Sequence, residues 1–122
     1  MLPKENRLNK KADFALVSKK GQVAQSKNFG LAYLATGQKV PPKFGFIVSN
    51  KISKKAVDRN RIKRILREIL RELLNDNQNG LALSLSNGLL FVLLARKSIL
   101  DASPADLKNE LVGKLRQISA IK

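Results

Sequence analysis

The sequence contains neither cysteine nor histidine. These absences exclude a thiolate or imidazole metal site, a cysteine nucleophile and a histidine general base. Acidic residues are also scarce, since 9 Asp and Glu stand against 24 Lys and Arg, which gives a formal charge of +15 over 122 residues. This excess of positive charge is typical of a protein that binds a polyanion such as nucleic acid.

Long apolar runs are absent as well. The N-terminal residues MLPKENRLNKK lack the apolar stretch of a secretory signal, and no stretch approaches the roughly 18 uninterrupted apolar residues of a membrane span. We therefore expect a cytoplasmic protein without a membrane partner. The chain length and its 43% of hydrophobic residues suit one domain over residues 1–122 with a modest core.

The segment 54–74 is the most informative part of the chain. Apolar residues recur in it at the three- and four-residue spacing of one helix face. They are Ile62, Ile65, Leu66, Ile69, Leu70, Leu73 and Leu74. The opposite face, at about 100° per residue, carries Asn60, Arg64, Arg67 and Arg71, with Arg61 and Lys63 on its flanks. Because clustered like charges repel one another, this face indicates phosphate binding. A solvated face relieved by Glu68 and Glu72 is the alternative.

The hydrophobic pattern predicts the element order α-β-β-β-α-β-α. The first helix covers about residues 10–20, with Asn9 as its cap and Gly21 to end it. Strands are predicted over 22–25, 29–35 and 44–49 before the basic helix, and over 89–96 after it. Residues 81–87 fit either a short strand or a loop. Together these elements predict an α/β (α+β) two-layer sandwich, in which three helices pack on a small sheet of about four strands.

Two further patterns locate the expected core. Ser103 and Pro104 begin the last helix, whose buried stripe is predicted to comprise Leu107, Leu111, Leu115 and Ile118. In the strand 29–35, Phe29, Leu31 and Tyr33 alternate with Gly30 and Ala32, so we expect the bulky face to lie in the core. Phe44 and Phe46 share one strand face and are also expected in the core.

The strand at 44–49 and the helix after it carry a specific resemblance. The sequence Phe44-Gly45-Phe46-Ile47-Val48-Ser49 is followed by Lys51, Lys54-Lys55-Ala56-Val57, Arg59-Asn60-Arg61-Ile62-Lys63-Arg64 and Arg67-Glu68. This combination resembles the signature of the protein subunit of bacterial ribonuclease P, and the similarity extends from about Arg7 to Ile118. The resemblance implies a mostly antiparallel sheet and a left-handed β-α-β crossover, whereas general chirality rules favour the right-handed one.

The resemblance also implies a function. In this family a large RNA, using bound Mg²⁺, removes the 5′ leader from precursor tRNA, and the protein carries no catalytic or metal-binding residue. The implied partners are ribonuclease P RNA and precursor tRNA, with no protein partner required. The expected RNA-binding residues are Lys51, Lys54, Lys55, Arg59, Asn60, Arg61, Lys63, Arg64, Arg67 and Arg71.

The expected cleft for the single-stranded leader departs from the family pattern. The family often places aromatic residues there, on which unpaired bases can stack. Phe14 is present in this chain, but Ser18 and Ala32 stand at the other two positions that are often aromatic. Base stacking is therefore expected to depend on Phe14 alone.

Three other functions are open to such a sequence. A ribosomal-type RNA-binding protein or RNA chaperone is the main alternative, because fold alone does not fix function. A basic amphipathic helix could also bind a membrane surface, but its apolar stripe is needed here to cover a sheet. An autonomous nuclease would need carboxylates such as Asp58, Glu68 and Glu72 to hold a metal. Glu68 and Glu72, however, lie one turn from arginines with which they can pair.

Overall fold

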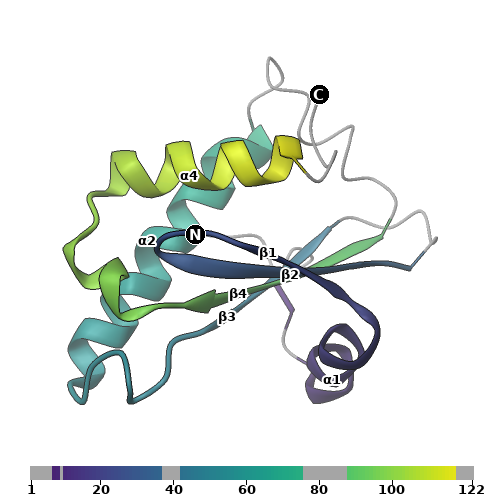
Figure 1. The fold of residues 1–122 in the computed structure, drawn as a ribbon, viewed down its shortest axis with the longest axis horizontal. Coiled ribbons are helices and arrows are strands. Elements are labelled where there is room, and N and C mark those ends of the chain that lie inside the picture. Colours follow the sequence, from purple (N-terminus) through teal and green to yellow (C-terminus); the bar gives the residue numbers. More distant parts are fainter. Residues whose placement is uncertain (1–6, 9, 37–41, 76–87, 118–122) are drawn as a thin grey trace.

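The computed structural model describes residues 7–8, 10–36, 42–75 and 88–117 (Figure 1). Its elements are α1 (Lys11–Lys20), β1 (Gln22–Gln25), β2 (Phe29–Ala35), β3 (Lys43–Ile47), α2 (Ala56–Asn75), β4 (Leu89–Ala95), the 3-10 helix η2 (Lys97–Asp101) and α4 (Pro104–Gln117). The predicted order is confirmed, and η2 is an element that the sequence pattern did not predict. Asn9, Ile118 and residues 81–87 lie outside the described residues.

The four strands form one mixed sheet in the order β1-β2-β4-β3. β2 pairs antiparallel with β1 and with β4, whereas β3 and β4 are parallel and are connected through α2. The prediction of a mostly antiparallel sheet is therefore confirmed. β3 ends at Ile47, two residues earlier than predicted, and Val48, the next residue, is buried in the core.

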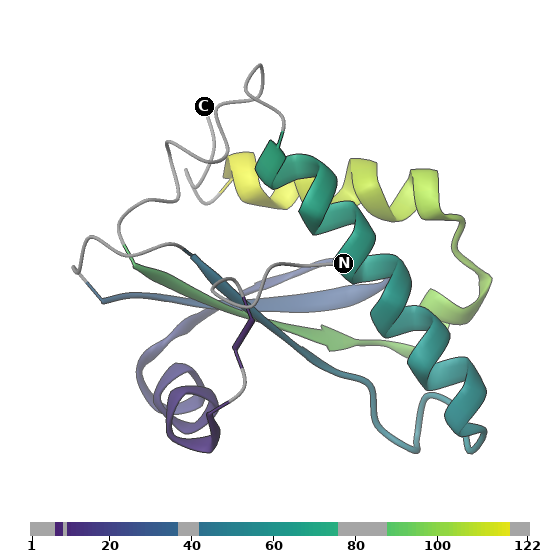
Figure 2. The same ribbon diagram turned by 180° about the vertical axis from the view of Figure 1, so that it is seen from behind.

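Helices lie on both faces of the sheet. α2 and α4 cover one face and α1 lies against the other, as the two opposite views show (Figures 1 and 2). The expected two-layer sandwich thus consists of the sheet with α2 and α4, and α1 adds a smaller cluster on the far side. No helix in the described part of the chain is both long enough and apolar enough to cross a lipid bilayer.

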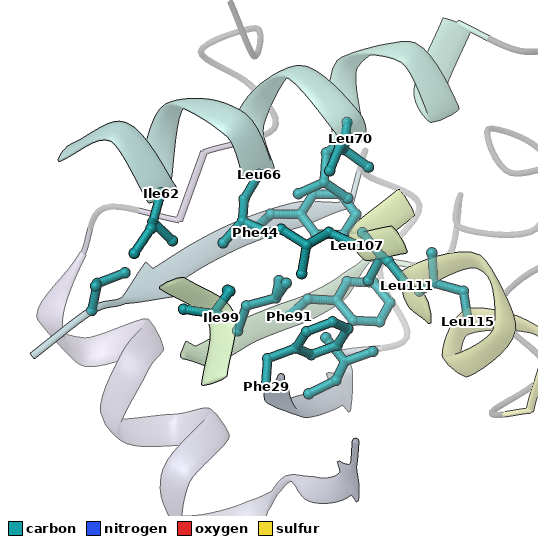
Figure 3. Close-up of a cluster of buried hydrophobic side chains, with 14 of the residues drawn as sticks. Phe29, Phe44, Ile62, Leu66, Leu70, Phe91, Ile99, Leu107, Leu111 and Leu115 are labelled. Carbon is teal, nitrogen blue, oxygen red and sulfur yellow. The ribbon is translucent and has the colours of Figure 1, made fainter. Parts of the chain in front are cut away.

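The main core lies between the sheet and the α2/α4 layer (Figure 3). The rings of Phe44 and Phe91 stack at its centre, with centroids 4.9 Å apart and planes 10° from parallel. Tyr33 and Phe46 are partly buried and pack at the margin. The apolar stripe of α2 is confirmed for five residues with buried side chains, which are Ile62, Leu66, Ile69, Leu70 and Leu73. Ile65 is partly buried against the same core, and the side chain of Leu74 lies outside the described part of the chain. The last helix likewise buries Leu107, Leu111 and Leu115.

Both helices that were predicted from cap residues form, and the described cap residues Ser103 and Gly21 lie where they were expected. At the start of α4 the Ser103 hydroxyl oxygen accepts a hydrogen bond of 3.1 Å from the Asp106 amide, as in a standard N-cap. Lys10 precedes α1 and makes no side-chain cap bond. Gly21 ends α1 with φ at −78°, and its amide donates to the Val17 carbonyl oxygen. A Cβ at Gly21 would lie 2.4 Å from that oxygen, so close approach is what requires glycine.

A polar contact joins α4 to the turn between β1 and β2. The Glu110 carboxylate accepts hydrogen bonds from the Ser26 hydroxyl, from the Asn28 amide at 3.0 Å and from Asn28 Nδ2 at 2.7 Å. Partial burial raises the pKa of Glu110, but the bonds from Ser26 and Asn28 outweigh it, so this pKa lies below its ordinary value. The contact fixes α4 against a turn that is far from it in sequence.

The face of the sheet next to α1 is only partly covered. A small cluster packs there, consisting of Leu8, Val17, Ala32, Leu90 and Val92, with Phe14, Leu16 and Leu34 at its margin. By strand alternation and pairing, Val23, Ile47 and Leu94 lie on the same face. These three side chains are 50%, 42% and 37% exposed, respectively. An aliphatic surface is therefore open to solvent beside α1.

Candidate nucleic-acid interface

The loop before α2 is fixed by its own polar groups. The Ser53 hydroxyl donates to Asp58 Oδ2 at 2.9 Å and accepts from the Lys55 amide at 3.2 Å. Arg59 Nη1 donates to the Ser53 carbonyl oxygen at 2.7 Å. Asp58 also lies in the first turn of α2, where a negative charge is favourable. One expected RNA-binding residue, Arg59, thus uses part of its guanidinium to hold the start of the basic helix.

A groove of about 670 Å³ lies along the solvent side of α2. It is lined by Arg7, Val57, Asn60, Arg61, Arg64, Arg67 and Glu68. Asn60, Arg61 and Arg64 are exposed, as helical periodicity predicted. Arg7 reaches the groove from outside α2, because residue 7 bridges to Phe44 at the edge of the sheet. We call this hollow the α2 groove.

Arg67 differs from the exposed arginines in its surroundings. It is partly buried, and its guanidinium carbon lies 5.8 Å from the centre of the Phe46 ring. A cation over an aromatic face at this distance is held by the ring quadrupole. This contact connects the basic helix to β3 and limits the positions that the Arg67 side chain can take.

The far end of the basic stripe is partly neutralised. Arg71 Nη2 and Nε donate to Glu68 Oε2 at 3.0 and 3.2 Å. Glu72, which was expected to pair with an arginine of its own helix, instead forms an ion pair of 3.3 Å with Lys108 of α4. Counting partners among the described residues, the positive charge of α2 that no carboxylate neutralises is therefore concentrated towards its N-terminal half, near Arg61 and Arg64.

The expected lysines lie around this half of the helix. Lys51, Lys54 and Lys55 are exposed in the loop that precedes α2. Lys63 is half-buried and lines a second, smaller hollow of about 150 Å³. The other residues lining that hollow are Arg7, Leu8, Phe14, Phe44, Gly45, Phe46 and Arg67. Because Arg7 and Arg67 line both hollows, the α2 groove continues around β3 towards α1.

The three residues expected in a leader cleft differ in their exposure to solvent. Phe14 is half-buried, and its ring lies over Gly45, where an added Cβ would be 2.5 Å from the Phe14 Cζ atom. Ser18 is exposed on α1. Ala32, at 5% exposure, is buried in the cluster with Val17 beneath α1. Ala32 therefore has little surface to offer a ligand.

The sequence interpretation missed the aliphatic surface of Val23, Ile47 and Leu94. These residues lie on three different strands, so their common face with Ala32 follows from alternation only once the pairing of the strands is known. Their exposure depends on α1 covering only part of that face, which no local pattern predicts.

Comparison with known proteins gives a consistent result. The family model described as Ribonuclease P matches residues 2–119. The ribonuclease P protein component of a Pseudanabaena species is 43% identical over 81 residues, which cover 66% of this chain and 70% of that one. The same component of Bacillus mycoides is 34% identical over 112 residues, which cover 91% of this chain and 89% of that one.

Solved structures agree in fold. The RNase P protein from Thermotoga maritima has a TM-score of 0.73 at 26% identity, with 91% of this chain and 96% of that chain covered. The RNase P protein of Staphylococcus aureus has a TM-score of 0.77 at 24% identity, with 98% of this chain and 100% of that chain covered. The resemblance carried by the strand at 44–49 and the basic helix is therefore confirmed.

Proposed function

The chain belongs to the ribonuclease P protein family, and we propose that it binds the RNA subunit of that holoenzyme and assists removal of the 5′ leader from precursor tRNA. The observation that carries this proposal is the α2 groove, where Arg61 and Arg64 are exposed side chains on one helix face. Guanidinium groups match phosphate oxygens, and counterion release on binding supplies affinity for a polyanion.

The other basic residues take different roles in this proposal. Lys51, Lys54 and Lys55 extend the positive surface from the N-terminal end of α2. Arg59 acts mainly by fixing the loop through Ser53. Arg67 presents its guanidinium from above Phe46, so it meets RNA in a restricted orientation. The affinity for RNA is thus expected to be greatest at the N-terminal half of α2, where carboxylates neutralise the least positive charge.

We place the leader on the open part of the sheet beside α1. Val23, Ile47 and Leu94 offer an aliphatic floor against which unpaired bases can lie. Phe14 borders this floor because its ring covers Gly45, two residues before Ile47 on the same face of β3. Ser18 lies one helical turn after Phe14 and can form the rim. Buried Ala32 supports the packing of α1 instead of contacting a base.

Catalysis belongs to the RNA in this proposal, and the RNA would hold the Mg²⁺ that the reaction uses. The protein's carboxylates near the basic face are engaged elsewhere: Asp58 with Ser53, Glu68 with Arg71, and Glu72 with Lys108. Within the described residues no group of three or more His, Cys, Asp or Glu side chains could hold a metal ion. These residues therefore do not fit a metal site, and we assign the protein a binding and positioning role.

Reconstitution tests the proposal directly. The purified protein, mixed with the ribonuclease P RNA of its own organism and precursor tRNA at low Mg²⁺, should increase cleavage at the mature 5′ end. The gain should shrink at high Mg²⁺, because divalent ions also offset phosphate repulsion. Metal-dependent cleavage by RNA-free protein would contradict the proposal. Tighter binding to ribosomal RNA than to ribonuclease P RNA would favour the ribosomal-type alternative.

Substitution in the α2 groove tests the assignment of the RNA surface. Arg61→Ala or Arg64→Ala should weaken binding to the RNA subunit and flatten its salt dependence, by about 0.7 to 0.9 in slope per lost phosphate contact. Both side chains are exposed, so the free energy of unfolding should change by less than about 0.5 kcal/mol. An unchanged salt dependence in both variants would show that RNA binds elsewhere.

A further inference from the structure

Helix α1 divides its face of the sheet into two parts. On one side of the helix lies the aliphatic surface of Val23, Ile47 and Leu94, on which the proposed function places the leader. On the other side, near the start of β4, lies a hollow of about 430 Å³. The proposed function gives this second site no role. We call it the β4 hollow.

The pairing of the strands keeps the two sites apart. The floor of the β4 hollow consists of three residues that are paired across β2, β4 and β3, which are Leu34, Leu90 and Lys43. Ile47 and Leu94 pair with each other four residues further along β3 and β4. The row between contains Ala32 and Val92, which are buried beneath α1. A ligand in the hollow would therefore not touch the aliphatic surface.

One flank of α1 forms the wall of the β4 hollow. The side chains that it contributes are Asp13, Leu16 and Lys20. Positions 13, 16 and 20 are spaced by three and four residues, so they share one side of the helix. Phe14 and Ser18, which border the leader surface in the proposed function, lie on the opposite flank. The hollow thus uses a part of α1 that has been assigned no binding role.

Charged side chains stand at both ends of the β4 hollow. Asp13 and Lys43 lie at its β3 end, because the residue that follows Asp13 covers Gly45 of β3. Lys20 lies at the β2 end, because an added Cβ on the glycine that follows it would be 2.8 Å from a carbonyl oxygen of β2. Seven residues separate Asp13 from Lys20, which is about 10 Å along a helix.

The charged groups of the β4 hollow are available to a ligand. Within the described residues, the side chains of Asp13, Lys20 and Lys43 form no ion pair and no hydrogen bond. Asp13 and Lys43 are nevertheless half-buried. A charged group that is partly removed from water gains from a partner that restores its hydrogen bonds. The β3 end therefore suits a group that offers N–H donors to the carboxylate and an acceptor oxygen to the ammonium.

We propose that the β4 hollow binds a guanosine 5′-phosphate group. The edge of guanine carries two N–H donors side by side, which match the Asp13 carboxylate, and a neighbouring carbonyl oxygen, which matches Lys43. The faces of the base lie against Leu34 and Leu90. The phosphate meets Lys20, whose distance along the helix from Asp13 matches the distance from base edge to phosphate in one nucleotide.

The same groups discriminate against uracil. Uracil has a carbonyl oxygen on each side of its single ring N–H, and the Asp13 carboxylate repels both oxygens. A pocket that is mostly apolar, with a few polar groups that fix orientation, is the usual form of a small-molecule site. The proposal goes beyond the binding of the RNA subunit and of the leader, because neither of them was placed on this flank of α1.

Titration of the full-length protein with guanosine 5′-monophosphate (GMP), followed by methyl NMR, tests the proposal. The signals of Leu34 and Leu90 should shift and saturate, whereas that of Leu107, in the core between the sheet and α4, should not. Uridine 5′-monophosphate (UMP), which has the same ribose and phosphate, should bind roughly tenfold more weakly.

A guanosine within RNA offers the same groups as free GMP. The trinucleotides UGU and UUU are therefore titrated as well. Tighter binding of UGU than of GMP, with weak binding of UUU, would assign the site to guanosine within RNA. Tighter binding of GMP than of UGU would assign it to the free nucleotide.

Two substitutions separate the base contact from the phosphate contact. Asp13→Asn replaces one acceptor oxygen by a donor and should abolish the preference for GMP over UMP. Asp106→Asn is its matched control, because Asp106 also lies in the first turn of a helix but outside the hollow. Lys20→Ala should weaken GMP and UMP alike, by roughly threefold, and leave guanosine unchanged. Lys19→Ala, at an exposed neighbour, should bind as wild type does.

Equal affinity of the wild type for GMP and UMP would overturn the proposal, because general attraction of phosphate to a chain of charge +15 would then explain the binding. Methyl shifts outside the hollow alone, or a preference for GMP that survives in a folded Asp13→Asn, would overturn it too. Thermal unfolding checks each variant. The comparison of nucleotides on wild type decides the matter even if Asp13→Asn fails to fold. Reconstitution with ribonuclease P RNA tests the proposed function separately.

Discussion

The two faces of the β-sheet are covered to different extents. On one face, α2 and α4 bury Phe29, Phe44 and Phe91 in a continuous core (Figure 3). On the other, α1 covers a small cluster around Val17 and leaves Ile47 exposed. We call the first the sealed face, because its core is covered, and the second the open face, which receives the leader in the proposed function.

A cavity in the core of the sealed face should lower the free energy of unfolding more than any other change considered. Leu70 is fully buried against the sheet, so Leu70→Ala should lower the free energy of unfolding by about 2 to 5 kcal/mol. Urea unfolding measures this change. Leu90→Ala on the α1 side should cost less, because the smaller cluster can collapse more easily around the cavity. If the two variants are equally destabilised, the faces contribute equally and the comparison is wrong.

On the open face, the close contact between Gly45 and Phe14 should be nearly as sensitive to substitution. An added Cβ at Gly45 would lie 2.5 Å from the Phe14 ring and 3.2 Å from the Leu8 Cβ atom. Gly45→Ala should therefore displace Phe14 and destabilise the domain by about 1 to 3 kcal/mol. Phe14→Leu removes the outer ring atoms, so the double variant should recover part of the loss. Simple additivity of the two changes in a double-mutant cycle would argue against this contact.

The sealed face could be predicted from the sequence because its pattern is local. The spacing from Ile62 to Leu73 identified the buried side of α2, and the alternation of Phe29 and Leu31 identified the core face of β2. Each pattern repeats within one element. The exposed arginines followed from the same periodicity, since they occupy the opposite side of the same helix.

The open face could not be predicted in the same way because it depends on where α1 lies. Ala32 and Ile47 occupy one face of the sheet, yet Ala32 is buried and Ile47 is exposed. The polar tie between Asn28 and Glu110 was also missed, as 82 residues separate its partners. Pairs so distant in sequence leave no periodic signal. Strand alternation defines a face, but only tertiary packing decides which part of it is covered.

The hydrogen bonds that Glu110 accepts make the free energy of unfolding depend on pH. The pKa of Glu110 is lower in the folded protein than its ordinary value, so folding favours the ionised form. This stabilisation is fully present above roughly pH 4.3, the ordinary value for Glu, and is lost as the pH falls through the lower folded pKa. A buried hydrogen bond to a charged group contributes about 1.5 to 3 kcal/mol to stability. Because Glu110 is partly exposed, we expect its three hydrogen bonds together to contribute only about 1 to 2 kcal/mol.

Glu110→Gln tests this pH-dependent contribution to stability. The variant should be less stable than wild type by about 1 to 2 kcal/mol at neutral pH, and the difference should narrow as the pH falls below 4. Chemical denaturation at several pH values gives both curves. Because the apolar contacts of Leu111 and Leu115 do not titrate, a difference that stays constant with pH would assign the loss to packing of α4.

Adding an aromatic side chain to the open face should produce the smallest change, and one confined to binding. Ser18 is exposed on α1, one turn after Phe14, so Ser18→Phe can offer a stacking platform without displacing buried atoms. Stacked bases gain about 1 to 3 kcal/mol on preformed platforms, and we expect about 1 on this exposed helix.

Affinity of the holoenzyme for precursor tRNA should therefore rise about fivefold, with no change for mature tRNA, which lacks the leader. Ser18→Leu is the control because it adds similar apolar area without an aromatic face. If Ser18→Leu raises precursor affinity as much as Ser18→Phe, the protein binds the leader through apolar area and not through aromatic stacking. The surface of Val23, Ile47 and Leu94 would then act in the same way. If neither variant changes it, the leader does not pass over this part of α1.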